Sequence, residues 1–200
     1  RHHLDQLIGE DGSILDIGGG HGILSQFMPH NDYFLVEPTL NGISGVSIPF
    51  EDDSFDAVVT CHVLEHVPAD ERLTFIDELI RVSRRNVLLF NPFKSDLIDD
   101  DEVTQLAYDV TESVWAKEHL ECGLPEEDEV RKHIESKGLS VKVAGYGDIY
   151  ASMSASFMSY FALEADSRDR LEKINQYMNL NFDHLTCGKY PTNLLMLITK

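Results

Sequence analysis

The sequence predicts an α/β fold of the doubly wound type, with a mostly parallel, seven-stranded sheet and helices on both faces. Two observations predict it. Short β-type runs alternate with segments of helical periodicity, and a glycine-rich loop directly follows the first run. The predicted strands cover residues 13–17, 33–37, 45–48, 55–60, 86–90, 141–143 and 194–198.

Three helices between these strands are marked by periodicity or by their ends. Residues 70–82 place four apolar side chains on one face, with Asp70 as the expected N-cap. Another helix has Pro125 in its first turn and closes at Gly138. A shorter helix follows the glycine-rich loop at residues 23–28.

Residues 1–200 are predicted to form one domain with two insertions, at about 94–124 and 148–193. Neither stretch follows the alternation of strands and helices. The first contains Trp115 and His119, and the second is rich in methionine and aromatic residues. The second stretch could line an apolar pocket, form a lid, pack in the core or form a dimer face, so a homodimer is one open prediction.

The composition excludes several classes of function. The chain carries 16 Lys and Arg against 35 Asp and Glu, a net charge of −19. Such a surface repels phosphates, so no nucleic-acid partner is expected. No apolar run approaches the roughly 20 residues of a membrane helix, so no membrane insertion is expected either.

The three cysteines, Cys61, Cys122 and Cys187, are too few and too scattered for a disulfide framework. This pattern predicts a reducing, cytoplasmic setting. No C-x-x-C pair is present, so no metal site is predicted.

The segment with the most chemical information is Asp16-Ile-Gly-Gly-Gly-His-Gly22, which lies between a predicted strand and a helix. Its glycines allow a tight turn and close approach to a ligand. Glu37 ends the second strand, and an acid at that place can accept hydrogen bonds from a ribose diol. Together these features predict a nucleoside-binding site.

The spacing of the glycines separates two kinds of ligand. A dinucleotide-binding loop has the pattern G-x-G-x-x-G. Counted from Gly18 its last glycine would fall at Ile23, and counted from Gly20 it would fall at Ser25. The loop fits G-x-G-x-G instead, which favours a nucleoside with an amino-acid tail over a pyrophosphate.

Residues 14–92 resemble the class I S-adenosylmethionine-dependent methyltransferases, in particular the broad group similar to the ubiquinone/menaquinone-biosynthesis C-methyltransferases. The resemblance rests on four segments in order: Leu15-Asp-Ile-Gly-Gly-Gly-His-Gly22, Val36-Glu37-Pro38, Ile48-Pro-Phe-Glu-Asp-Asp-Ser-Phe-Asp-Ala-Val58 and Cys61-His-Val-Leu-Glu-His-Val67. It implies the Rossmann-like methyltransferase fold, S-adenosylmethionine as cofactor and S-adenosylhomocysteine as product.

The resemblance also implies where the cofactor binds. Gly18, Gly19 and Gly20 would pack against its methionine and ribose parts. Asp16 would orient this loop or reach the amino group, and Glu37 would hold the ribose hydroxyls. The structural alternatives are a capping carboxylate for Asp16 and a solvated strand end for Glu37.

By the same resemblance, Pro38 and Ile48 would flank the adenine, and Cys61 and His62 would line the sulfonium side. A small buried apolar role is an equal alternative for Cys61. Many relatives carry an acid that contacts adenine, but residues 43–48 contain none. The hydroxyl of Ser44 or a backbone amide of that stretch would replace it.

A general base is needed only if the methyl acceptor must lose a proton. His62 and His66 are the candidate catalytic residues, with Glu65 beside them, and a structural histidine that holds the turn is the alternative for His66. His119 could face an acceptor, although an ordinary half-exposed histidine is favoured.

These observations predict methyl transfer from S-adenosylmethionine to a small-molecule or lipid-like acceptor, bound over the carboxyl edge of the sheet. A non-catalytic, methyltransferase-like module that binds the cofactor is the alternative. A nucleotide-dependent oxidoreductase or epimerase is disfavoured by the glycine spacing.

Overall fold

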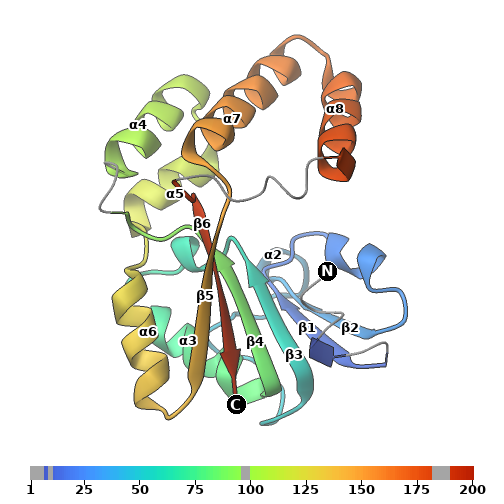
Figure 1. Cartoon of the computed structure of the whole chain (residues 1–200), viewed down its shortest axis with the longest axis vertical. Coiled ribbons are helices and arrows are strands. Elements are labelled where there is room, and N and C mark those ends of the chain that lie inside the picture. Colours follow the sequence, from blue (N-terminus) through green and yellow to red (C-terminus); the bar gives the residue numbers. More distant parts are fainter. Residues whose placement is uncertain (1–6, 9–10, 96–99, 182–189) are drawn as a thin grey trace.

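The computed structural model of the chain describes residues 7–8, 11–95, 100–181 and 190–200. Within them, strands form one sheet in the order β2-β1-β3-β4-β6-β5 (Figure 1). The strands are β1 (Ser13–Ile17), β2 (Asp32–Val36), β3 (Phe55–Cys61), β4 (Ser83–Asn91), β5 (Ser140–Tyr146) and β6 (Asn193–Thr199). Strands β1 to β4 pair in parallel, and β6 runs antiparallel between β4 and β5. The predicted fold class is confirmed, with six strands in the described part instead of seven.

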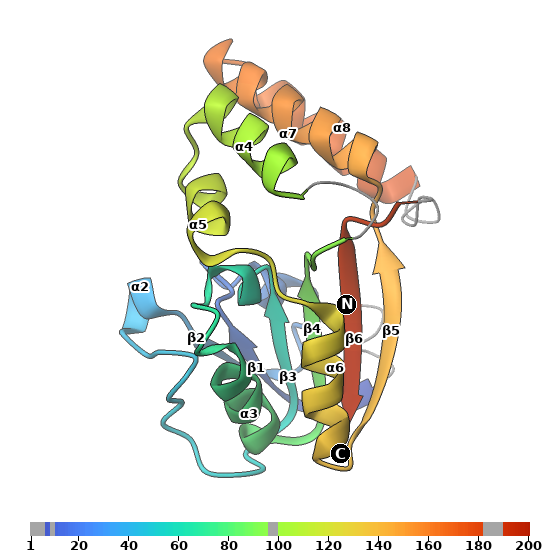
Figure 2. The same ribbon diagram turned by 90° about the vertical axis from the view of Figure 1, so that its left-hand side faces the viewer.

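The helical elements of the described residues lie on the faces and at one end of this sheet (Figures 1 and 2). They are η1 (Ile23–Phe27), α2 (Pro38–Asn41), η2 (Leu64–His66), α3 (Arg72–Val82), α4 (Asp100–Thr111), α5 (Val114–Cys122), α6 (Glu127–Ser136), α7 (Ile149–Glu164) and α8 (Arg168–Asn181). No helix of the described ranges has the length and the apolar character needed to cross a membrane.

Helices α3 and α6 cover one face of the sheet (Figure 2). Phe75 and Ile76 of α3 and Ile134 of α6 are fully or almost fully buried there. The opposite face carries η1 and the helical residues Leu7 and Ile8, which pack against a smaller cluster. Both faces are therefore apolar, which explains why the strands are nearly continuous hydrophobic runs.

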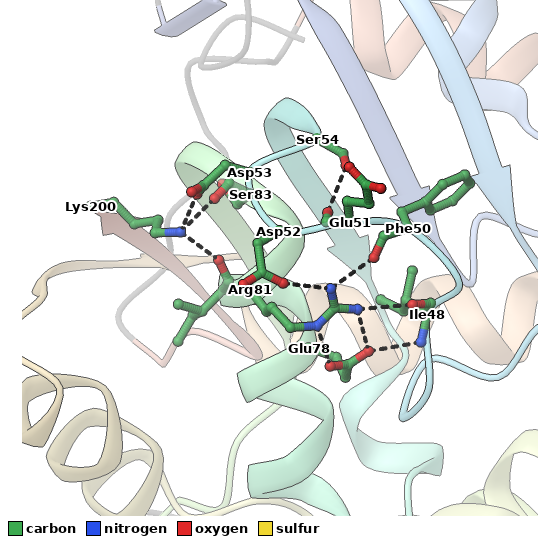
Figure 3. Close-up of polar contacts among 11 residues, drawn as sticks. Ile48, Phe50, Glu51, Asp52, Asp53, Ser54, Glu78, Arg81, Ser83 and Lys200 are labelled. Atoms are coloured by element: carbon green, nitrogen blue, oxygen red, sulfur yellow. Dashed lines mark hydrogen bonds and ion pairs between the residues drawn. The ribbon is translucent and has the colours of Figure 1, made fainter.

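The predicted strand at 45–48 does not form, because side chains of α3 take the backbone groups that a neighbouring strand would need (Figure 3). The amide of Ile48 donates to Glu78 Oε2 at 2.8 Å. The Arg81 guanidinium donates to the carbonyls of Ile48 at 2.8 Å and Phe50 at 2.7 Å. Arg81 also pairs with Glu78 and Asp52, so the segment is held as a loop against the helix.

We predict that Arg81→Met lowers the free energy of unfolding by about 1–2 kcal/mol, because two carbonyls and two carboxylates lose their shared donor at a partly exposed site. Urea unfolding followed by circular dichroism measures this. Arg84→Met is the control, since Arg84 is half-exposed and pairs with Asp56 alone among the described carboxylates. A loss of about 0.5 kcal/mol or less is expected for it. Equal losses in the two variants would contradict the role given to Arg81.

Two predicted helix starts shift by a short distance. Asp70 is not the N-cap of α3: the amide of Glu71 donates to the carbonyl of Pro68 at 2.9 Å, so a turn precedes the helix and Glu71 takes the cap position. Pro125 lies outside α6, where its carbonyl accepts from the amide of Lys94 at 2.9 Å. The predicted end at Gly138 holds, since this glycine has φ +77° just after the helix.

The two predicted insertions supply the helices beyond the carboxyl ends of the parallel strands. Helices α4 and α5 belong to the first insertion and α7 and α8 to the second, and all four lie at that end of the sheet (Figure 1). Residues 96–99 and 182–189 of these insertions, with Cys187, lie outside the described residues. The single-domain division stays a proposal.

Candidate functional site

The glycine-rich loop turns tightly where β1 ends. The amide of Gly18 donates to the carbonyl of Val36 at the end of β2, at 2.8 Å, and the amide of Gly22 donates to the carbonyl of Gly19 at 2.9 Å. Gly18, Gly20 and Gly22 have φ between +55° and +71°, where a side chain would be strained. The sequence prediction of a glycine-dependent turn at this place is confirmed.

Asp16 is buried beneath this loop and holds it. Its side chain accepts a hydrogen bond from the hydroxyl of Tyr33 at 2.5 Å. A Cβ added to Gly19 would lie 2.2 Å from Asp16 Oδ2, so the loop backbone rests on the carboxylate. Burial raises the pKa of Asp16, the hydrogen bond from Tyr33 lowers it, and the charge of Glu37 raises it, with a net increase.

We predict that Tyr33→Phe destabilises the fold in a pH-dependent way. The raised pKa of Asp16 means that its stabilising contribution is full below its unfolded pKa of 3.8 and is lost as the pH rises through the folded value. Removing the Tyr33 donor raises the folded pKa further and leaves a buried carboxylate less satisfied, at a cost of about 1–2 kcal/mol.

Urea unfolding below about pH 4 and near about pH 8 measures the effect of Tyr33→Phe, which should be larger at the higher pH. Tyr160→Phe in α7 serves as the control and should change stability little at either pH. A loss for Tyr33→Phe that does not depend on pH would contradict the coupling to Asp16.

Glu37 connects the same loop to α2. Glu37 Oε2 accepts from the amide of Gly20 at 3.1 Å, while Oε1 accepts from the amide and hydroxyl of Thr39 at 3.2 and 2.9 Å. The side chain therefore caps α2, and the residue is only 8% exposed, so it is not a solvated strand end. Oε1 already accepts two hydrogen bonds, so the capacity left for a bound ligand is the second lone pair of Oε2.

Two cavities meet at Gly18. A cavity of about 640 Å³ is lined by Asp16, Gly18 and Gly19 and by the apolar side of the sheet next to η1. A second cavity of about 230 Å³ lies on the other side of Gly18 and is lined by Pro38 and by residues 44–46. The glycine loop therefore lies between the larger, mainly apolar cavity and the smaller cavity.

The predicted adenine-flanking residues occupy different places. Pro38 lines the smaller cavity. Ile48 is 4% exposed in the main core and lines neither cavity. Ser44, which was considered as a replacement for the missing acid, does line the smaller cavity, and so does Glu71, whose position sequence reasoning missed.

Cys61 and His62 lie where β3 ends. Cys61 lines the larger cavity, and its pKa is raised to about 11 by loss of water around the thiol and by the charges of Glu65 and Asp16, so the thiol stays protonated at neutral pH. His62 has φ +56°, and its backbone amide donates to the carbonyl of Phe90 at 2.8 Å. A residue that is not glycine at such φ is uncommon and often marks a functional turn.

Glu65, which is fully buried, lies at the centre of a group of polar side chains that follows β3. Its Oε1 lies 3.2 Å from His62 Nδ1, and Asn91 donates to its Oε2. Burial opposes ionisation of Glu65, but the hydrogen bond from His62 and the nearby histidines outweigh it and lower its pKa. His62 is 48% exposed, so it presents its ring to solvent while a buried carboxylate orients it.

His66 and His119 pack against each other beside this carboxylate, with their ring planes tilted by 57°. Their ring centroids lie 4.8 Å apart, and Trp115 packs edge-on against His119 at 5.3 Å. Burial lowers the pKa of His119 to about 4, so this ring is neutral at physiological pH. His119 thus lies inside the polar group, although the sequence favoured an ordinary half-exposed histidine.

Arg72, at the start of α3, fixes the elements that carry these side chains. Its Nε donates to the carbonyls of Leu64 and Val67 at 3.2 and 3.1 Å, and its Nη2 donates to those of Cys122, at 2.9 Å, and Gly123. One buried guanidinium therefore joins η2 to the end of α5. Arg72 and Asn91 were missed by sequence reasoning, because their partners are distant carbonyls and a distant carboxylate.

The methionine and aromatic residues of the second insertion line a third, smaller cavity. It measures about 150 Å³ and lies between α4, α5 and α7, with Trp115, Met153 and Phe157 in its wall. Met158 and Phe161 on α7 are exposed instead. The apolar stretch therefore lines a pocket with some of its side chains and presents others to solvent.

A family comparison identifies the class of protein. The family model described as a methyltransferase domain matches residues 2–127, which is more than half of the chain. The chain belongs to this methyltransferase domain family. The predicted enzyme class is thus confirmed, while the narrower ubiquinone/menaquinone group stays a prediction. No curated protein matches the chain.

Solved structures share the fold across almost the whole chain. A protein from Galdieria sulphuraria, provisionally identified as a sarcosine dimethylglycine methyltransferase, is 18% identical with a TM-score of 0.65, over 100% of this chain and 81% of that one. A SAM-dependent methyltransferase from Archaeoglobus fulgidus is 13% identical with a TM-score of 0.59, over 100% and 90%.

A third similar structure contains a cofactor product. The magnesium protoporphyrin IX methyltransferase of Synechocystis, solved with bound SAH, is 12% identical with a TM-score of 0.51, over 95% of this chain and 74% of that one. The predicted cofactor agrees with what these neighbours use.

Proposed function

We propose that this protein transfers a methyl group from S-adenosylmethionine to a small, largely apolar or lipid-like acceptor. The observation that carries the proposal is the glycine loop, which is held between two buried carboxylates with a cavity on either side of Gly18. The family match supports the reaction class.

The two cavities fit the two ends of such a cofactor. The smaller cavity, beside Pro38, suits the adenine, and Glu37 at the end of β2 suits the ribose hydroxyls. Asp16 and Gly19 line the larger cavity, where the amino-acid part would lie. Under this proposal Cys61, which lines the larger cavity, and His62 next to it in the chain would lie on the reacting side.

The cofactor supplies an activated methyl group, so the protein mainly has to position the acceptor and exclude water. The apolar wall of the larger cavity, with Phe90 and Tyr146, serves that purpose. Where the acceptor carries a proton that must leave, His62 is our candidate base, because buried Glu65 orients its ring. His66, the other candidate base from the sequence, lines the smaller cavity instead, on the side that this proposal gives to the adenine.

The acceptor class follows from charge and from the lining of the cavities. A net charge of −19 disfavours polyanions, and the cavities beside the loop and beneath α7 are mainly apolar. A cytoplasmic setting and a homodimer stay predictions.

Many relatives bind adenine through an acid that residues 43–48 of this chain lack. Glu71 allows a test of which group could recognise the adenine here. Glu71 is one of the residues that line the smaller cavity, and we propose that its carboxylate accepts a hydrogen bond from the exocyclic amine. Glu71→Gln should weaken cofactor binding roughly 3- to 10-fold, the size of one partly exposed hydrogen bond. An analogue without that amine should bind both proteins equally, and a preference of wild type for it would contradict the contact.

Calorimetric titration with S-adenosylmethionine, S-adenosylhomocysteine and NADH tests the proposal as a whole. Micromolar binding of the first two but not of NADH, lost in Gly20→Val, is expected. An assay that follows transfer of a labelled methyl group to a panel of apolar acceptors then tests whether the protein catalyses methylation. Binding without transfer to any acceptor class would favour the non-catalytic module, and preference for NADH would overturn the assignment.

A further inference from the structure

Glu65, His66 and His119 bring three metal-binding side chains together at the junction of η2 and α5. One ligand atom from each lies within 4.8 Å of those of the other two. His119 Nε2 lies 3.8 Å from Glu65 Oε1. Glu65 is fully buried and His119 nearly so. The three ligands therefore come from two separate elements and converge inside the protein.

The surroundings hold these ligands in place. Asn91 and His62 bind the Glu65 carboxylate and fix its orientation, as groups behind metal ligands commonly do. His66 Nδ1 pairs with Glu118 Oε2 at 2.7 Å, and this contact holds the orientation of the ring. Arg72 joins the two elements through backbone carbonyls, so the ligand positions are set before any ion binds.

We propose that these three side chains form a binding site for a divalent transition-metal ion of the zinc type. Two imidazoles and one carboxylate are a ligand set that zinc uses, with water in the remaining position. Tetrahedral zinc ligands stand roughly 3.3 Å apart, because each bond is about 2.0–2.1 Å long. The present separations are wider, up to 4.8 Å, so the proposal requires the two imidazoles to rotate toward Glu65 when the ion binds.

The sequence did not predict this site, because its cysteines are scattered and its histidines are not spaced as a metal motif. The third ligand, His119, comes from the first insertion and joins the others only through the packing of α5 on η2. A bound ion would link that insertion to the carboxyl edge of the sheet, next to His62. If the proposed function holds, the bound ion would stabilise the part of the first insertion that lies next to the acceptor.

Titration of the full chain with Zn²⁺ after removal of metals by EDTA tests the site. Wild type should bind about one equivalent more than His119→Asn, and the affinity at this site should fall roughly 100-fold or more in the variant. His2 and His3 could bind zinc adventitiously, but they are present in every variant, so the difference reports on the site. His133→Asn is the matched control, because His133 of α6 pairs with Asp77 of α3, and neither residue belongs to the proposed site.

Two further measurements separate ligation from a merely structural role of His119. His119→Cys should regain the equivalent, since a thiolate also ligates zinc. Co²⁺ should develop visible absorption bands with wild type and His119→Cys but not with His119→Asn. Mg²⁺ should not compete, because it prefers an all-oxygen site. Melting curves without metal show whether each variant is folded.

The outcomes distinguish this site from the proposed function, because no cofactor is present in the assay. Zinc binding that is equal in wild type and folded His119→Asn would overturn the proposal, and so would its absence in wild type. In that case the contacts of His119 with Glu65 and of His66 with Glu118 would serve only to hold α5 against η2.

Discussion

Gly19→Ala is expected to weaken the binding of S-adenosylmethionine roughly 100-fold. The added methyl group would lie 2.2 Å from Asp16 Oδ2 and 2.5 Å from its Cγ, well inside contact distance. Asp16 cannot move aside easily, because it is buried at the end of β1 and is bound by Tyr33. The loop must therefore lift away from the site, and overpacking of this kind costs up to about 3 kcal/mol.

Calorimetric titration of wild type and Gly19→Ala with S-adenosylhomocysteine measures this effect. Gly19 does not adopt a positive φ, so the substitution tests contact with Asp16 and not backbone strain. A double variant, Gly19→Ala with Asp16→Ala, removes the collision and should recover part of the affinity. A double variant as weak as the sum of the two single changes would contradict the steric explanation.

Gly138→Ala is the control for the general cost of replacing a glycine. Gly138 follows α6, has φ +77° and would place its Cβ in open space. We expect a loss of about 1–2 kcal/mol in stability from the left-handed backbone, with unchanged cofactor affinity. A drop in affinity there would mean that destabilisation alone impairs binding.

The elements that sequence predicts well are those fixed by neighbouring residues. The turn after β1 has positive φ at Gly18, Gly20 and Gly22, which glycine adopts without strain, and both the apolar run and the glycines are visible in the sequence. Glu37 can also be recognised from the sequence, because it directly follows the β-type run that predicts β2. From these local signals alone, the sequence predicts that Asp16 and Glu37 belong to the nucleoside-binding site.

The parts that sequence misses depend on which elements pack together. Tyr33 reaches Asp16 only because β1 and β2 pair in parallel, with Ile14 opposite Tyr33. The predicted strand at 45–48 fails because Glu78 and Arg81 of a later helix bind its backbone. Each of these contacts joins residues far apart in the chain, where periodicity and spacing carry no information.

His119 shows the same limit within the site. The sequence assigns it only to the first insertion, yet the residue lies 3.8 Å from Glu65 across the junction of α5 and η2. Arg72 determines that junction by binding carbonyls on both sides of it. Backbone carbonyls are present in every residue, so the sequence gives no sign of which ones a buried arginine will bind.

The second large effect expected is that of Glu37→Gln, which should weaken the binding of S-adenosylmethionine roughly 10- to 100-fold. Hydrogen bonds to a charged acceptor contribute about 1.5–3 kcal/mol each, and the amide turns one acceptor oxygen into a donor. That donor would face either the amide of Gly20 or the amide of Thr39, both of which already donate to this side chain. The variant therefore loses ligand contacts and loosens the loop.

A cofactor analogue without the ribose 2′-hydroxyl separates these two contributions. If Glu37 binds the ribose, wild type should bind the analogue more weakly than the cofactor, and Glu37→Gln should bind both alike, as in a double-mutant cycle. Glu126→Gln is the control, because Glu126 occupies the N-cap of α6 without a capping hydrogen bond. If Glu37→Gln lowers affinity but still distinguishes the analogue as wild type does, Glu37 acts only by holding the loop through Gly20, and the ribose must be read by another group.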